Sequence, residues 1–110
     1  MKKSLILLVL TLTLVSYQTK LIAQTFKVSN ATELKEAISK ASPGDEIIMK
    51  NGIWKAIQIK FYGTGTKDKP ITLRAETAGK VSIEGASNLQ IGGTYLVVKV
   101  LYNLKLITIL

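Results

Sequence analysis

Residues 43–101 read PGDEIIMKNG IWKAIQIKFY GTGTKDKPIT LRAETAGKVS IEGASNLQIG GTYLVVKVL. This stretch contains six short runs with the composition of β-strands, separated by turns rich in Gly, Pro, Asn and Asp. The runs are Glu46–Lys50, Ala56–Phe61, Ile71–Arg74, Val81–Glu84, Leu89–Ile91 and Tyr95–Lys99. None of them has the period of a helix, so the stretch predicts an all-β fold.

The pairing of these strands is left open by periodicity. Asn51-Gly52 is a good hairpin turn, which would favour an antiparallel sandwich. The β-branched and aliphatic residues on alternate positions, such as Ile57, Ile59, Ile71 and Leu73, suit stacked ladders equally well. Such ladders would place the strands in a parallel β-helix, with each coil stacked on the one below.

One helix is expected before the strands. Asn30 is a suitable N-cap, and Glu33 stands where a capping box places its acidic residue. Apolar residues then recur at helical spacing to Ala41, and Ser42-Pro43-Gly44-Asp45 ends the helix in a tight turn. Asn30-Ala-Thr32 also matches a glycosylation sequon, but we assign Asn30 to the cap because the cap explains it without a glycan. A short strand, Thr25–Val28, is expected just before this helix.

The first 23 residues predict a secretory signal peptide. Lys2 and Lys3 form its basic start, residues 5–15 form an apolar run, and cleavage is expected between Ala23 and Gln24. The apolar run has 11 residues, whereas a membrane-spanning helix needs about 20. The sequence therefore predicts a secreted or periplasmic protein without a stable membrane anchor.

Composition narrows the chemistry of the expected mature chain, Gln24 to Leu110. The chain has no Cys and no His, which excludes disulfides, thiol chemistry and a histidine base. Removing Lys2, Lys3 and Lys20 changes the net charge from +8 to +5 (12 basic minus 7 acidic residues). The basic residues are scattered singly, so nucleic acid is not the expected partner, whereas an acidic polysaccharide fits both the charge and the compartment.

Several spaced blocks of the chain together resemble a known family. They are Pro43–Met49, Asn51-Gly-Ile-Trp-Lys55, Gly63–Ala75, Gly79-Lys-Val-Ser-Ile-Glu-Gly85 and Leu96–Tyr102. These blocks resemble the N-terminal end of the chondroitinase B and alginate lyase family, which are secreted bacterial polysaccharide lyases. The resemblance runs from about residue 28 to residue 102.

The resemblance implies a right-handed parallel β-helix of the pectin lyase type, of which this chain holds the first coils and a short N-terminal capping helix. It also implies cleavage of uronate-containing polysaccharide, alginate or chondroitin and dermatan sulfate, by β-elimination. In the family a calcium ion or an equivalent positive group, a Lys base and an Arg serve this reaction, and they lie on later coils. No catalytic, cofactor-binding or metal-ligating residue is therefore carried over to this chain.

The expected organisation is a signal peptide over 1–23, the cap and first coils over 24–102, and an atypical tail over 103–110. Val100 stands where the family pattern usually has Gly, and the tail lacks turn residues, which suggests a truncated or frameshifted product. The chain is accordingly expected to lack lyase activity alone and to bind acidic polysaccharide weakly or not at all. The alternative is a non-catalytic β-solenoid module that binds acidic glycans or a partner chain.

Some individual residues invite a functional interpretation. The basic residues Lys50, Lys55, Lys60, Lys67, Lys69 and Arg74 could form a track for uronate carboxylates, but solvated strand faces and turns explain them as well. Trp54 and Tyr62 could stack on sugar rings, although packing is the more usual role. Adjacent Asp45 and Glu46 should point to opposite faces of a strand, so a turn role is expected for Asp45. Gly63-Thr-Gly-Thr66 lacks the ending of a phosphate-binding loop.

Overall fold

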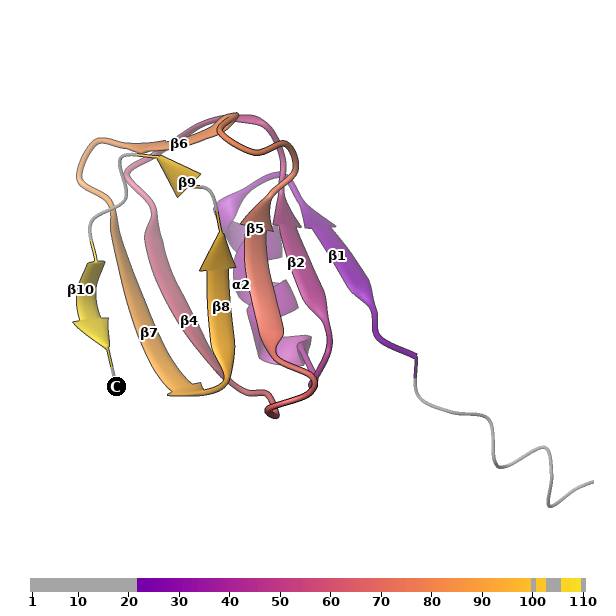
Figure 1. The fold of residues 1–110 in the computed structure, drawn as a ribbon. Coiled ribbons are helices and arrows are strands. Elements are labelled where there is room, and N and C mark those ends of the chain that lie inside the picture. Colours follow the sequence, from indigo (N-terminus) through magenta and orange to yellow (C-terminus); the bar gives the residue numbers. More distant parts are fainter. Residues whose placement is uncertain (1–21, 100, 103–105, 110) are drawn as a thin grey trace, which may run out of the picture.

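The computed structural model describes residues 22–99, 101–102 and 106–109. Most of the predicted signal peptide and part of the predicted tail lie outside these residues. The described chain is mostly β-strand with one short helix (Figure 1). None of its helices has the length and hydropathy that crossing a membrane requires.

The strands lie in three sheets. The first contains β1 (Thr25–Val28), β2 (Glu46–Met49), β5 (Ile71–Ala75) and β8 (Leu96–Lys99), paired in that order. The second contains β3 (Gly52–Lys55), β6 (Val81–Glu84) and β9 (Leu101–Tyr102), and the third contains β4 (Gln58–Thr64), β7 (Asn88–Thr94) and β10 (Leu106–Ile109). From β2 onward the chain visits each sheet once before returning to the first, and we call each such pass a coil.

Every pairing between described strands is parallel. The antiparallel sandwich left open by the sequence is therefore wrong for this part of the chain. Asn51-Gly52 makes no hairpin, because Gly52 begins β3 and the Asn51 side chain ties one coil to the next. Its amide donates to the Thr77 hydroxyl at 3.0 Å and its oxygen accepts from the Thr77 N–H at 3.0 Å.

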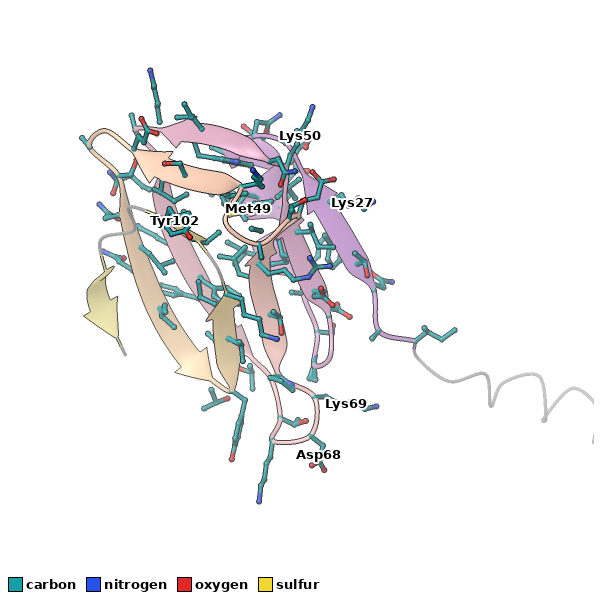
Figure 2. All side chains as sticks on the ribbon, turned by 45° about the horizontal axis from the view of Figure 1, so that its top comes forward. Lys27, Met49, Lys50, Asp68, Lys69 and Tyr102 are labelled. Atoms are coloured by element: carbon teal, nitrogen blue, oxygen red, sulfur yellow. The ribbon has the colours of Figure 1, made fainter. Side chains whose placement is uncertain are left out.

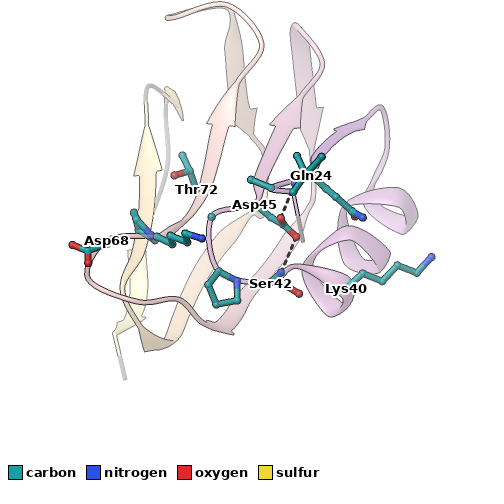
Figure 3. Close-up of a pocket in the computed structure, with 12 residues that line it drawn as sticks. Gln24, Lys40, Ser42, Asp45, Asp68 and Thr72 are labelled. Carbon is teal, nitrogen blue, oxygen red and sulfur yellow. Dashed lines mark hydrogen bonds between the residues drawn. The ribbon is translucent and has the colours of Figure 1, made fainter. Parts of the chain in front are cut away.

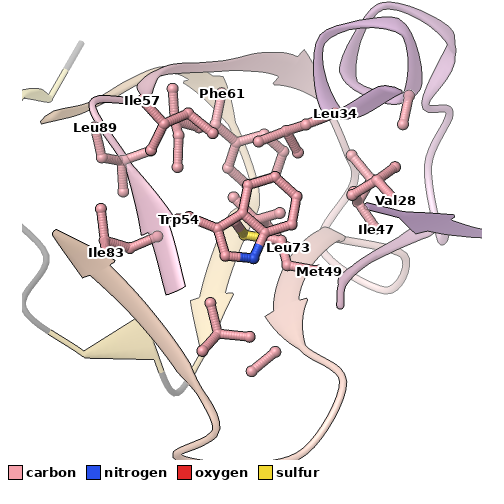
Figure 4. Close-up of a cluster of buried hydrophobic side chains, with 14 of the residues drawn as sticks. Val28, Leu34, Ile47, Met49, Trp54, Ile57, Phe61, Leu73, Ile83 and Leu89 are labelled. Carbon is pink, nitrogen blue, oxygen red and sulfur yellow. The ribbon is translucent and has the colours of Figure 1, made fainter. Parts of the chain in front are cut away.

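The ladders expected from the alternating aliphatic residues form between successive coils. Ile47 pairs with Leu73, and Ile59 pairs with Leu89. The side chains of these four residues are all buried at 1% exposure or less. They belong to one core cluster in which Trp54 and Phe61 fill the space between the sheets (Figure 4). Stacked burial of this kind is the main stabilising term that the fold offers.

Helix α2 (Ala31–Lys40) packs against β1, β2 and β4 and buries Leu34 and Ala37. Its predicted cap is confirmed, since the Asn30 side chain accepts from the Glu33 N–H at 2.9 Å. The Glu33 carboxylate reaches back to the Ser29 N–H at 2.7 Å, one residue earlier than in a standard capping box. The helix thereby covers the first coil, as the sequence predicted.

The corner between the second and third strand of a coil takes a left-handed backbone. Ala56 has φ 50° in the first coil and Gly85 has φ 74° at the stacked position in the second. The Ala56 N–H donates to the Glu84 carbonyl at 3.0 Å, which joins the two corners. An alanine in this region is strained relative to glycine.

Candidate functional site

The outward side chains of β4 and β7 form a polar surface along the third sheet. We call this surface the polar face, and it consists of Gln58, Lys60, Tyr62, Asn88 and Gln90. Strand alternation explains it, because Ile59, Phe61 and Leu89 between these residues point inward and are buried. The parallel register sets Gln58 beside Asn88 and Lys60 beside Gln90.

Hydrogen bonds between the two strands hold most of the polar face in place. The Tyr62 hydroxyl donates to Gln90 Oε1 at 3.0 Å, and Asn88 Nδ2 donates to Gln58 Oε1. Gln58 Nε2 in turn donates to the Ala86 carbonyl at 3.3 Å. The amide groups are therefore oriented before any ligand arrives, which lowers the entropic cost of binding one.

A hollow of about 320 Å³ lies between this face and helix α2. Lys35 and Thr32 line it from the helix, and Gln58 and Lys60 line it from β4. Both lysines are exposed, and within the described part of the chain neither has a carboxylate at salt-bridge distance. Two unpaired ammonium groups beside amide donors can attract a carboxylate or sulfate.

A larger hollow, of about 730 Å³, lies at the other end of α2 (Figure 3). The turn over residues 42–45 and the loop over 68–70 line it, and Lys40, Asp68 and Lys69 are its exposed charges. Asp45 is buried in its wall, and its two carboxylate oxygens accept the backbone N–H groups of Gln24 and Ser42, each at 2.8 Å. This arrangement confirms the turn role expected for Asp45.

The basic residues considered from the sequence do not form one track. Lys50 follows β2, Lys55 ends β3, Lys60 lies within β4, Lys67 and Lys69 lie in the loop before β5, and Arg74 lies in β5. These positions belong to three different sheets and a loop, and Figure 2 shows Lys50 and Lys69 at opposite ends of the strands. Arg74 also pairs with Glu46 and donates to the Ala75 carbonyl at 2.9 Å. Only Lys60 belongs to the polar face.

The two aromatic candidates divide between packing and surface. Trp54 is 8% exposed and donates its Nε1–H to the Lys50 carbonyl at 3.0 Å, so packing explains it. Tyr62 is 43% exposed on the polar face. An exposed tyrosine offers a ligand both an apolar ring and a polar hydroxyl group.

Three members of the polar face were not singled out from the sequence: Gln58, Asn88 and Gln90. The signal was present, because Gln58-Ile-Lys-Phe-Tyr62 and Asn88-Leu-Gln-Ile91 alternate polar and apolar residues. What the sequence lacks is the register, which places residues about 30 positions apart side by side.

The family resemblance implies a calcium ion, which needs a suitable set of oxygen ligands. Calcium takes six to eight oxygen ligands, mostly carboxylates. Among the residues that the structure describes, no group of three acidic side chains could hold a metal ion. Asp45 is occupied by backbone donors and Glu46 by Arg74. These residues do not fit the ion, and no step through it is assigned to them.

The described residues place the protein in a class of β-protein built from stacked parallel coils, with a helix over one end and a polar outer face. The family model for chondroitinase B matches residues 28–105. The chain belongs to the chondroitinase B family.

Several solved structures of lyases are similar to this chain. The PL6 family polysaccharide lyase Pedsa3628 from Pseudopedobacter saltans is 47% identical over 69% of this chain, with a TM-score of 0.67. The PL6 family alginate lyase AlyGC is 42% identical over 70%, with a TM-score of 0.69. A mannuronic acid specific family 6 lyase from human gut microbiota is 30% identical over 77%, with a TM-score of 0.64. The matched region spans 18%, 11% and 20% of those three chains. A search of curated protein sequences gave no match.

Proposed function

We propose that this chain is the N-terminal part of an exported polysaccharide lyase that cleaves uronate-containing polymers. Its three sheets form the walls of the first coils of a right-handed parallel β-helix, and α2 closes that end. The observation that carries the proposal is the family match over residues 28–105, supported by 42–47% identity to PL6 lyases. Alginate is the first substrate to test, with chondroitin and dermatan sulfate next.

The proposed reaction is β-elimination. A base takes the proton from C5 of the uronate, the bond from C4 to the glycosidic oxygen breaks, and a C4–C5 double bond forms while the departing oxygen gains a proton. The groups that would perform these steps are expected on later coils, so no residue of this chain is given a catalytic role. The described coils would support that region and extend its surface toward the polymer.

The polar face and Lys35 of the neighbouring helix α2 support a contribution of these coils to binding. Lys35 and Lys60 can pair with carboxylates, and the oriented amides of Gln58, Asn88 and Gln90 can bond to sugar hydroxyls. Because the lysines are solvent-exposed, each contact would be weak and dependent on salt. This observation also favours the second candidate function, a non-catalytic module for acidic glycans.

A chimera tests the first proposal. Residues 28–102 of this chain would replace the matched segment of Pedsa3628, and unsaturated products would be followed by ultraviolet absorbance on alginate, chondroitin sulfate and dermatan sulfate. We expect a folded chimera with the same substrate preference as Pedsa3628 and activity within about tenfold, because the reacting groups are left in place. A chimera that unfolds cooperatively but makes no product would contradict the proposal.

Binding by the chain alone tests the second candidate. Affinity electrophoresis in alginate gels would compare the wild type with a Lys35→Ala/Lys60→Ala double variant and with the matched control Lys67→Ala/Lys69→Ala, which removes the same charge away from the polar face. We expect retardation to fall only in the first variant. An equal loss of retardation in both variants would mean that net charge alone causes the binding. Formation of unsaturated product by the chain alone would overturn its expected inactivity.

A further inference from the structure

Asp45 is a buried carboxylate with an unusual partner. Its side chain is 4% exposed, and Oδ1 accepts the N–H of Gln24 at 2.8 Å while Oδ2 accepts the N–H of Ser42 (Figure 3). A buried charge is costly unless hydrogen bonds or an opposite charge compensate it. In the uncleaved chain both compensating groups are neutral amides.

Gln24 stands at the point where the sequence predicts signal-peptide cleavage. Its carbonyl accepts the Glu46 N–H at 3.0 Å, so Gln24 extends the pairing of β1 with β2 by one residue. Its nitrogen is therefore fixed by backbone geometry beside Asp45. After cleavage between Ala23 and Gln24, this nitrogen is no longer an amide but the α-ammonium group of the mature chain.

We propose that Asp45 is the binding site for the α-ammonium group of the mature protein. Removal of the signal peptide converts a charge-to-amide hydrogen bond into an ion pair between the buried Asp45 carboxylate and the exposed residue Gln24, and this pair holds β1 on β2. The carboxylate already makes charge-assisted bonds to both amides, and the α-ammonium group adds the opposite charge that a buried carboxylate otherwise lacks. Lys40, Asp68 and Lys69 line the same hollow, but they are exposed to solvent.

The site has a chemical consequence for Gln24 itself. An N-terminal glutamine cyclises when the lone pair of its α-nitrogen attacks Cδ. The N–Cδ bond forms, a proton passes from the α-nitrogen to Nε2, and the Cδ–Nε2 bond breaks so that Nε2 leaves as ammonia. An ammonium group held by Asp45 has no free lone pair. The folded protein should therefore protect its own N-terminus from conversion to pyroglutamate.

The inference rests on the proposed export and cleavage, and it is independent of lyase activity. The full 110-residue precursor would be exported from a bacterial host, and the mature N-terminus would be read by mass spectrometry. Loss of ammonia would then be followed under native conditions for the wild type, Asp45→Asn and the control Asp68→Asn, which removes a carboxylate from the same hollow.

We expect a mature chain that begins at Gln24 and cyclises on the order of tenfold more slowly in the wild type and Asp68→Asn than in Asp45→Asn, as a charge-assisted bond must open first. In urea the three rates should be equal. Equal native rates in the wild type and Asp45→Asn would overturn the proposal, as would a mature chain that starts elsewhere.

A second measurement tests the proposal without a variant, in case Asp45→Asn does not fold. Wild-type protein would be cyclised in urea and refolded, which leaves one N–H donor at the N-terminus but removes its charge. We expect the pyroglutamate form to have a lower Tm than the free-amine form. Identical Tm values would show that Asp45 needs only a hydrogen-bond donor, which contradicts an ammonium site.

Discussion

Val28 and Val98 lie in the two outer strands of the same sheet, yet their side chains are buried to different degrees. Val28, in β1, is 3% exposed, whereas Val98, in β8, is only partly buried. Helix α2 packs against β1. Among the described residues, β8 has a strand neighbour on one side only.

The difference shows what the helix contributes. In this fold the inward side chains of a strand are fully buried when a strand or helix packs on each side of it. Ile47 in β2 and Leu73 in β5 have a strand on both sides and are 0% exposed. At the first coil α2 supplies that cover, and between coils the next strand supplies it. Apolar burial contributes roughly 25 cal/mol per Å², so the covered end should be the more stable one.

We expect the largest loss of stability from Gly93→Ala, which tests how closely the coils stack between these two ends. Gly93 has φ 125°, and a Cβ there would lie 1.8 Å from the Gly63 carbonyl oxygen of the coil below. Gly93→Ala must force β7 away from β4, so we expect a loss of unfolding free energy of about 4 kcal/mol or more, measured by urea denaturation.

Gly52→Ala is the matched control for Gly93→Ala. Gly52 has a similar φ of 131°, but no atom lies within 4 Å of the position a Cβ would take. Only backbone strain remains, of about 1–2 kcal/mol. Equal losses in the two variants would mean that coil-to-coil contact does not set the cost.

Val28→Ala in β1 and Val98→Ala in β8 make the same substitution at the two ends of the sheet. Removing two buried methyl groups and leaving a cavity at Val28 should cost about 2 kcal/mol, while the partly buried Val98 should cost about 1 kcal/mol or less. Thermal and urea unfolding would measure both. A greater loss at Val98 would mean that the end formed by β8 is the better covered one.

Asn30→Ala would loosen the cover without touching the core. The variant removes the bond from the Glu33 N–H and should cost about 1 kcal/mol. Ser39→Ala, which removes an exposed bond to the Glu36 carbonyl in the same helix, should cost no more than about 0.5 kcal/mol. If both variants unfold like the wild type, the helix cap does not limit stability.

Ala56→Gly is the smallest expected effect and has the opposite sign. Glycine relieves the left-handed backbone at the corner of the first coil, making it like Gly85 in the second. Glycine also makes the unfolded chain more flexible, which offsets part of this relief. We therefore expect the unfolding free energy to rise by about 0.5 kcal/mol. Ala86→Gly, beside that corner and exposed, should give no gain.

The sequence predicted the elements of the described chain better than their pairing. Helix α2 was expected from Asn30, Glu33 and the apolar spacing, and the six core strands were found within a few residues of their bounds. These features are local, because caps and alternation act over a few residues. Strand direction is not local, and the Asn51-Gly52 signal pointed to a hairpin that does not form.

Strand β3 was missed for the same reason. Its four residues, Gly52 to Lys55, were taken as a turn followed by a packing tryptophan, and only pairing with β6 makes them a strand. The polar face was likewise hidden until the register placed Lys60 beside Gln90. The bond from Asp45 to Gln24 spans 21 residues, a separation at which sequence pattern carries no signal.

The central claim is that successive coils stack in parallel with this register, and the absence of native cysteine makes it directly testable. Lys60→Cys with Gln90→Cys places two thiols on direct cross-strand partners, whereas Gln58→Cys with Gln90→Cys is offset by two residues. Disulfides need Cα atoms within about 7 Å. Under mild oxidation, mass spectrometry should find a near-complete intramolecular disulfide in the first pair and little in the second. Equal yields in the two pairs, or more disulfide in the offset pair, would contradict the parallel stack.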